Sequence, residues 1–273
     1  RIREGEDTVG FRSMRVRLIA FLLIISLVPL FTLGFFSYEI SSTILKNEAQ
    51  KLTNQLVGES KKVIKQYADD VVQISVMLFT NQKLTSLISE EKSDDEYKNY
   101  QRDSEIREMV TNVTNSRVDV QSVSILSEDG KMFSTDYAMH DIEGLNKKEW
   151  FQQVIKADGN VVWFPTSDKS RINDKESDWT FGVARSIRVL NRDRPYVLLI
   201  EIRESALSEL LNDMTLHENG DLRIVDHDGR VISSKNEKEL GQQLSKKTYS
   251  FLNELEPGSL LKKGELIAYA PID

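Results

Sequence analysis

The sequence predicts an α+β protein: an N-terminal transmembrane helix continues into a long helix, and two tandem modules built on antiparallel sheets follow. Three observations predict this class. An uncharged apolar run occupies Leu18 to Phe36, a stretch of helical periodicity without proline comes next, and one strand–turn–strand pattern occurs twice. Strands that follow one another between separate helices are typical of helices packed on antiparallel sheets.

The apolar run at residues 18–36 is expected to cross a membrane, because as a helix it covers about 28 Å, close to the hydrocarbon thickness of a bilayer. Three arginines immediately precede it: Arg12, Arg15 and Arg17. The positive-inside rule then places residues 1–17 in the cytoplasm and the chain after residue 37 outside the cell. A cleaved signal peptide and a buried core helix are the alternatives, but the run is longer than the usual apolar region of a signal peptide.

Composition excludes several kinds of partner and chemistry. The formal net charge is −7; residues 1–17 contribute five Arg against three acidic residues, +2, so the remainder sums to −9. An acidic outer part lacks the basic stripe that nucleic acid requires. The chain has no cysteine, so a disulfide, a thiolate nucleophile and a cysteine-ligated metal are excluded. Because the sequence starts at Arg1 and not at Met, and ends in an expected strand or at its edge, we interpret it as a fragment.

Residues 37–90 are expected to form one long amphipathic signalling helix, because apolar residues recur at steps of mostly three, four or seven. They are Ile40, Ile44, Leu45, Leu52, Leu56, Val63, Tyr67, Val71, Ile74 and Leu78. Such a stripe must be buried against something. The near half is expected to pair with a second copy, giving a homodimer, and the far half to pack on its own domain; a helix absorbed entirely into one core is the alternative.

The strongest strand signal is a hairpin that occurs twice. Val120 to Leu126 and Lys131 to Thr135 flank an Asp-Gly turn, which is a strong hairpin signal, and a helix from Tyr97 to Ser116 precedes them. The segment Ile125 to Thr135 aligns without gaps on Ile224 to Ser234. We interpret the repeat as two related modules, at residues 91–204 and 205–273, although coincidence between two ordinary hairpins is the alternative.

The remaining elements follow from periodicity and turn residues. In order, we expect a helix at 147–156, a strand at 161–164 that ends at Pro165, a polar loop at 167–178, a half-buried strand at 179–188, a central strand at 196–202, a helix capped by Ser205 and ending near Met214, short helices near 237–244 and 248–254, and a strand at 266–270.

This order of elements resembles the double Cache sensor region of bacterial receptors. The residues Trp150-Phe151 at a helix start resemble that family's binding helix, and the opening, which ends Gly-Phe-Phe-Ser-Tyr at Tyr38, is similar to YesM-like sensor histidine kinases. The resemblance implies two PAS-like modules, the distal one binding a small molecule. It also implies a second membrane helix, a linker and a kinase beyond residue 273, an incomplete second module, and no enzyme activity in this fragment.

The resemblance also implies a ligand site in the distal module. Amino-acid-sensing members carry Arg-x-Trp-Tyr and then Tyr-x-Asp; this chain has Lys148-Glu149-Trp150-Phe151 and Trp163-Phe164-Pro165. Lysine lacks the bidentate fork of arginine and the acidic partner is missing, which argues against an amino acid. A pocket walled by Trp150, Trp163 and also Trp179 would suit the apolar face of a sugar or another flat ligand, so a sugar is favoured. The candidate ligand-binding residues are Trp150, Phe151, Lys148, Trp163, Trp179, Arg185, Asp136 and Tyr137. The alternative for each tryptophan is a core residue, which is the commoner role, and Arg185 could pair with a carboxylate of its own domain.

No cofactor, metal or catalytic site is expected. The three histidines, His140, His217 and His227, do not have metal-ligand spacing, and the segment Asp226-His227-Asp228-Gly229 lacks the remaining ligands of a calcium loop. Nucleophile and phosphate-binding motifs are missing. We therefore expect the sensing region of a sensor histidine kinase. The alternatives are a chemoreceptor or cyclase sensing region, a membrane-anchored extracellular enzyme, and a surface protein without a ligand.

Overall fold

The computed structural model of the protein describes residues 14–135, 142, 144–172, 174–188, 195–214, 220–246, 248–250, 258–262 and 265–272. The chain divides into two compact units. One contains the described residues up to 55 together with those between 259 and 268, and the other contains the described residues between 56 and 258 together with 269–272. Helix α1 (Met14–Phe79, 66 residues) runs through both units.

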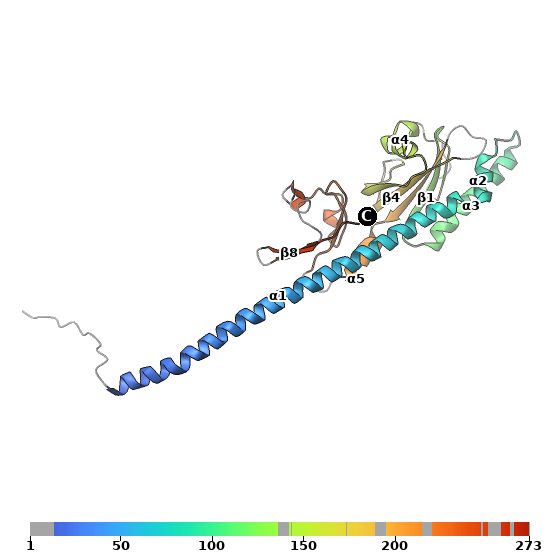
Figure 1. Ribbon diagram of the computed structural model, residues 1–273. Helices are drawn as coiled ribbons and strands as arrows, with labels where there is room; N and C mark the ends of the chain where they lie inside the picture. Colours follow the sequence, from blue (N-terminus) through green and yellow to red (C-terminus); the bar gives the residue numbers. More distant parts are fainter. Residues whose placement is uncertain are drawn as a thin grey trace, which may run out of the picture. The chain divides into compact units, whose positions relative to one another are not determined.

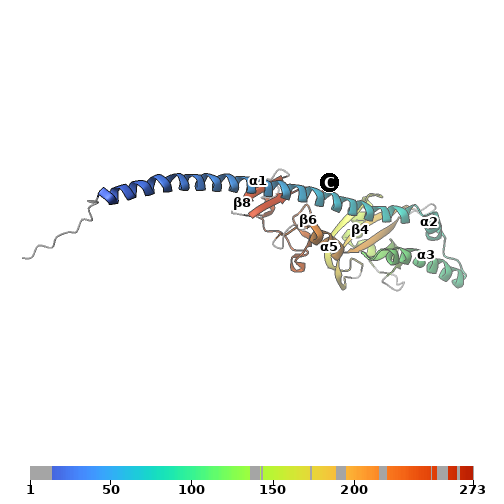
Figure 2. The ribbon, with the colours of Figure 1, turned by 90° about the horizontal axis from the view of Figure 1, so that it is seen from below.

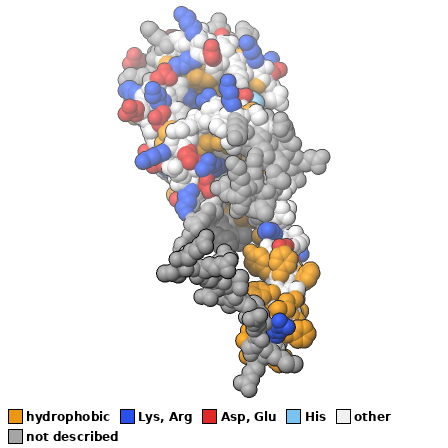
Figure 3. Space-filling view, turned by 90° about the vertical axis from the view of Figure 1, so that its left-hand side faces the viewer, with side chains coloured by type: hydrophobic (Ala, Val, Ile, Leu, Met, Phe, Trp, Pro, Cys, Tyr) orange, Lys and Arg blue, Asp and Glu red, His pale blue; other side chains and the backbone are white. Residues whose placement is uncertain are grey.

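In the first unit, the N-terminal part of α1 exposes its apolar side chains. Leu22, Phe31 and Phe36 are 57%, 71% and 63% exposed, and the apolar window of the helix contains no buried residue. Figure 3 shows hydrophobic side chains gathered on this part of the helix. The helix is long and apolar enough to cross a membrane. The same unit contains most of a two-stranded sheet of β8 (Gly258–Lys262) and β9 (Glu265–Tyr269), of which only the second strand was expected.

The long helix ends eleven residues before the predicted limit of residue 90. After Phe79 the chain turns, and Asn81 starts a separate helix α2 (Gln82–Ser89). The side chain of Asn81 accepts a hydrogen bond of 3.0 Å from the backbone N–H of Leu84, which satisfies one of the donors left unpaired at a helix start. The continuous apolar periodicity concealed this break, because both helices direct their apolar residues into the same core.

The second unit is built on a five-stranded antiparallel sheet of order β2-β1-β5-β4-β3. Its strands are β1 (Val120–Ser127), β2 (Met132–Ser134), β3 (Val162–Lys169), β4 (Glu176–Ile187) and β5 (Tyr196–Arg203). Strand β5 is the central strand, as its apolar sequence predicts. Most of its residues are apolar because both of its faces are covered. Helix α3 (Glu96–Ser116) and residues 56–79 of α1 cover one face, and the 3-10 turn η1 (Leu145–Lys147) and α4 (Glu149–Lys156) cover the other (Figures 1 and 2).

Two hydrophobic clusters lie on these faces. The helix-side cluster includes Val71, Ile74 and Leu78 of α1, which are 0%, 7% and 3% exposed. The prediction that the far half of the long helix packs on its own domain is therefore confirmed. The α4-side cluster is smaller and includes Phe151 and Val154 of α4, both fully buried. Because successive residues of a strand point to opposite faces, the sequence position of each strand residue decides which cluster it joins.

The repeated hairpins have matching turns in separate sheets. In the second, β6 (Arg223–Val225) pairs with β7 (Val231–Ser234) as a two-stranded sheet. Leu126 opposes Met132 and, ninety-nine residues later, Val225 opposes Val231. The turn glycines, Gly130 and Gly229, have φ of 93° and 81°, a conformation that favours glycine. Both turns are closed by a hydrogen bond from the glycine N–H to the residue three before it.

Several predicted boundaries are wrong. Strand β3 continues through Pro165 to Lys169, so the predicted loop at 167–178 shrinks to 170–175. Proline is tolerated there because β3 is an edge strand and its pairing with β4 is irregular between Phe164 and Ser167. Helix α5 (Ser205–Met214) begins at Ser205, so that residue lies inside the helix and does not cap it. The short helix expected near 237–244 is a single 3-10 turn, η2 (Glu237–Glu239).

Candidate functional site

The two tryptophans expected to share a pocket wall lie on opposite faces of the sheet. Trp150 on α4 packs edge-to-face on Phe164, with ring centroids 6.0 Å apart. Trp163, the residue before Phe164, is 43% exposed and stacks on Phe181, which belongs to the helix-side cluster. Adjacent strand residues cannot face the same side. The predicted common wall of Trp150 and Trp163 is therefore wrong.

Of the other predicted residues, Phe151 lies against Trp150, with ring centroids 5.7 Å apart, whereas Arg185 lies on the opposite face of the sheet. Phe151 is fully buried in the α4-side cluster. The Nζ of Lys148 donates to the carbonyl oxygen of Ile172 and to the Oδ2 of Asp174, at 2.8 Å each. Lys148 therefore binds residues of the loop between β3 and β4. Arg185 lies on β4 opposite Leu198, with an Nε that is buried and has no hydrogen-bond partner among the residues that the structure describes. That these side chains contact a ligand stays a prediction.

Some predicted residues lie outside the described part of the chain. They are the candidate ligand-binding residues Asp136 and Tyr137. The histidines His140 and His217, to which no role was assigned, lie outside it as well. His227 is described, and its Nε2 lies 3.3 Å from the Oδ2 of its neighbour Asp228 on the exposed turn of the second hairpin. In the described ranges, no group of three metal-ligating side chains lies close enough to hold an ion.

A row of small and polar residues crosses the five-stranded sheet on its α4 side. Ser134 opposes Ser124, Ser122 opposes Glu201, and Glu201 opposes Gly182. The hydroxyls of Ser124 and Ser134 are 2.8 Å apart, and the Ser122 hydroxyl donates to Glu201 Oε2 at 2.8 Å. The serines and Glu201 are at most 3% exposed. This polar row puts a carboxylate and several hydroxyls in the otherwise apolar interior, where buried charge is costly unless it is paired.

Arg171 lies against this polar row. Its Nη1 is 3.5 Å from the position that a Cβ would take at Gly182, so the absence of a side chain there makes room for the guanidinium. The guanidinium carbon lies 5.4 Å from the centre of the Phe164 ring, a cation–π distance. The Nη2 donates to the carbonyl oxygen of Pro165. Burial lowers the pKa of Arg171, and the nearby carboxylate of Glu201 opposes that shift.

Three buried polar atoms around Arg171 have no hydrogen-bond partner among the described residues. They are the Nη1 of Arg171, the indole Nε1 of Trp150 and the hydroxyl of Thr180. Thr180 precedes Gly182 by two positions on β4, so it faces the same side of the sheet. Buried polar groups are nearly always hydrogen-bonded in folded proteins. Since two of the three groups are pure donors, acceptor atoms of a ligand would satisfy them.

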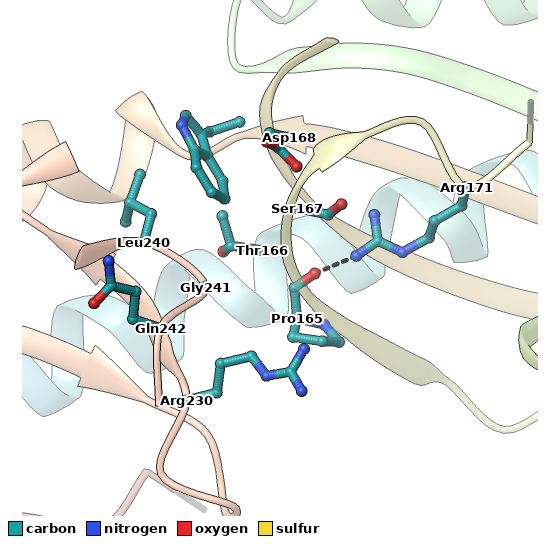
Figure 4. A pocket seen from close by; sticks show the side chains of 10 residues that line it. Pro165, Thr166, Ser167, Asp168, Arg171, Arg230, Leu240, Gly241 and Gln242 are labelled. Carbon is teal, nitrogen blue, oxygen red and sulfur yellow. Dashed lines mark hydrogen bonds between the residues drawn. The ribbon is translucent and has the colours of Figure 1, made fainter. Parts of the chain in front are cut away.

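A cavity of about 400 Å³ lies beside Arg171 at the β3 edge of the sheet. From β3 and β4 it is lined by Pro165, Thr166, Ser167, Asp168, Arg171 and Trp179, and from the second hairpin and the segment after η2 by Arg230, Leu240, Gly241 and Gln242 (Figure 4). Trp179 is the only sequence-predicted site residue among those that line this cavity.

Sequence reasoning missed Arg171 and Glu201. Glu201 carried a usable signal, because it is the one charged residue inside the apolar run Tyr196 to Ile202 of a predicted central strand. A carboxylate in such a position needs a hydrogen-bonding or charged partner. Arg171 carried no such signal, since it lies in a segment of many charged residues, and only the fold brings it to the sheet face.

Comparison with known structures agrees with this architecture. The ligand-binding domain of the Pseudomonas aeruginosa PAO1 amino acid chemoreceptor PctC, in complex with GABA, matches with a TM-score of 0.60 at 12% identity, over 82% of this chain and 93% of that one. The sensory domain of the Campylobacter jejuni chemoreceptor Tlp3 with isoleucine bound matches with 0.56 at 13% identity, over 82% and 87%. These identities support a shared fold and no more.

A third structure, the extracellular domain of a protein named as histidine kinase vpHK1S-Z8, matches with a TM-score of 0.62 at 14% identity, over 81% of this chain and 85% of that one. No curated protein sequence matches the chain. The family model of the Cache domain matches residues 41–273, which is most of the sequence. The chain therefore belongs to the Cache domain family.

Proposed function

We propose that this chain is the extracytoplasmic ligand-sensing region of a membrane-anchored sensor histidine kinase, with two tandem Cache modules. The exposed apolar start of α1, preceded by arginines, supports an anchor with its N-terminus in the cytoplasm. The matching hairpin turns in separate sheets support an internal duplication. The opening that resembles YesM-like kinases, and the fold shared with the extracellular domain of vpHK1S-Z8, favour a kinase output.

The ligand that we propose is a small amino acid, in place of the sugar that the sequence favoured. One observation carries this choice: the Nη1 of Arg171, which is buried and has no hydrogen-bond partner among the described residues, lies on the same face of the sheet as the buried carboxylate of Glu201. Arginine suits a carboxylate group, and Glu201 with the serine hydroxyls suits an ammonium group. The sugar was favoured because Trp150 and Trp163 were expected to line one pocket, and they lie on opposite faces of the sheet.

A path by which ligand binding reaches the membrane begins at β1. The hydroxyl of Tyr67, on α1, donates to Asp119 at 2.8 Å, and Arg117 holds the same carboxylate at 2.6 and 2.9 Å. Asp119 precedes β1, the strand that carries Ser122. A ligand that prefers one arrangement of β1 would shift the position of α1 through this contact, by no more than its difference in affinity for the two states.

The experiment is a calorimetric titration of the whole chain in detergent with a panel of L-amino acids, GABA and sugars. We expect at least one amino acid to bind, and Arg171→Lys to weaken it more than tenfold because the fork is lost while the charge remains. Arg188→Lys is the matched control, since Arg188 is exposed and pairs with Asp158 away from the site. Binding of sugars alone, or equal affinity in both variants, would contradict the proposal.

A chemoreceptor is the second candidate. Two of the structures that share this fold are sensory domains of chemoreceptors. Any coding sequence that follows residue 273 would discriminate the two outputs, because a kinase requires a phospho-acceptor histidine followed by an ATP-binding domain.

A further inference from the structure

We propose that the cavity at the edge of β3 is a second binding site, which takes a small organic monoanion with a flat apolar body. This goes beyond the proposed sensing site under α4, because its walls come from two different sheets and include a different tryptophan. Its volume of about 400 Å³ falls within the range of about 300–1,000 Å³ typical of small-molecule sites.

The charges that line the cavity favour an anion. Arg171 and Arg230 contribute two positive charges, and Asp168 contributes one negative charge. Arg230 comes from the turn of the second hairpin and extends toward Pro165 of β3 (Figure 4). Its backbone N–H is bonded to Asp226 at 2.8 Å, while no described residue pairs with its guanidinium. A guanidinium at the rim of a cavity offers a planar, bidentate group to a carboxylate.

The other walls supply an apolar surface of fixed shape. Trp179 and Leu240 line the cavity, and Leu240 is only 3% exposed. Gly241 has φ of 70°, and a Cβ at this position would lie 3.4 Å from the indole of Trp179. The backbone therefore runs close to the ring because this residue is glycine. Its N–H is bonded to the carbonyl of Val231 at 2.9 Å, which fixes the wall against β7.

Occupation of this cavity would strengthen the contact between the two sheets. Two hydrogen bonds already link the five-stranded sheet and the segment after it to the second hairpin: the Thr166 hydroxyl donates to the carbonyl oxygen of Ile232 at 2.6 Å, and the Ser233 hydroxyl donates to Glu204. A ligand held by Trp179 on one side and Arg230 on the other adds a further link between β4 and the second hairpin. Arg171 borders both this cavity and the polar row, so the two sites share one cation.

The test is calorimetry on the whole chain with benzoate and with benzamide, its uncharged counterpart of the same shape. We expect benzoate to bind and benzamide to bind at least tenfold more weakly. Arg230→Gln should weaken benzoate at least tenfold. Lys238→Gln, which removes an exposed charge on η2 that does not line the cavity, should leave the affinity unchanged.

Three results would overturn the inference: no benzoate binding at 10 mM by the wild-type chain, equal affinity for the two probes, or equal affinity of Arg230→Gln and wild type. Arg230 is exposed, so the Arg230→Gln variant is expected to remain folded. Loss of benzoate binding in Trp150→Phe would assign the probe to the site under α4 and would also contradict the inference. If no amino acid binds, the benzoate and benzamide measurements still test this proposal. Its failure can therefore be distinguished from failure of the proposed sensing function.

Discussion

The contact between Tyr67 and Asp119 gives a prediction of defined magnitude. Tyr67→Phe removes one hydroxyl and leaves the ring, which packs against the helix-side cluster. The lost bond is 2.8 Å long and has a charged acceptor, and such bonds contribute about 1.5–3 kcal/mol. Asp119 keeps both bonds from Arg117, so we expect the low end, about 1.5 kcal/mol, which corresponds to a fall in Tm of roughly 3–6 °C.

The assay is urea unfolding followed by circular dichroism, with Tyr100→Phe as control, because Tyr100 is 72% exposed and exposed substitutions change stability by less than about 0.5 kcal/mol. The prediction has a pH signature. Arg117, by its hydrogen bonds, holds the pKa of Asp119 below its usual 3.8. The stability from this carboxylate is therefore present above pH 3.8 and is lost as pH falls through its lower folded pKa. A Tyr67→Phe midpoint equal to that of Tyr100→Phe would refute the reasoning.

Three further predictions concern other parts of the chain. Burial raises the pKa of Glu204 above its usual 4.5, so the folded state loses stability as the pH rises from 4.5 through the folded pKa. Glu204→Gln should flatten this fall in the free energy of unfolding above pH 4.5, and an unchanged slope contradicts this. Gly229→Ala should lower the free energy of unfolding by more than about 1 kcal/mol, because φ is 81° and a Cβ would lie 2.5 Å from the ring of Tyr249; a smaller loss in urea unfolding would argue against that turn geometry. Leu52→Cys should cross-link two copies under oxidation if the near half of α1 pairs, and a monomer band would exclude pairing there.

Local signals predicted the elements that depend on turn chemistry and burial. The Asp-Gly pairs predicted both hairpins, because the turns need a residue with positive φ at Gly130 and Gly229, and glycine adopts this conformation readily. The apolar run from Tyr196 gave the central strand, since β5 has a neighbour on each side and a core on each face. The break at Asn81 was missed because apolar spacing continues across it and only the cap reveals it.

The candidate site was less predictable, because it depends on which face of a strand each residue occupies. Trp163 and Phe164 are adjacent, and the strand register decides that Phe164 meets Trp150 while Trp163 faces the other side. The extension of β3 beyond Pro165 was not predicted, because a proline usually ends a strand. Arg171 reaches the polar row through a loop, so no periodicity could connect it with Glu201 across thirty positions of sequence.

The most direct test of the sensing account is a crystal structure of the chain with the amino acid that binds it most tightly. The account predicts the ligand on the α4 side of the five-stranded sheet, with its carboxylate within hydrogen-bond distance of Arg171 Nη1 and its ammonium group facing Glu201 and the serine hydroxyls. A ligand on the opposite face, beside Trp163 and Arg185, would contradict it.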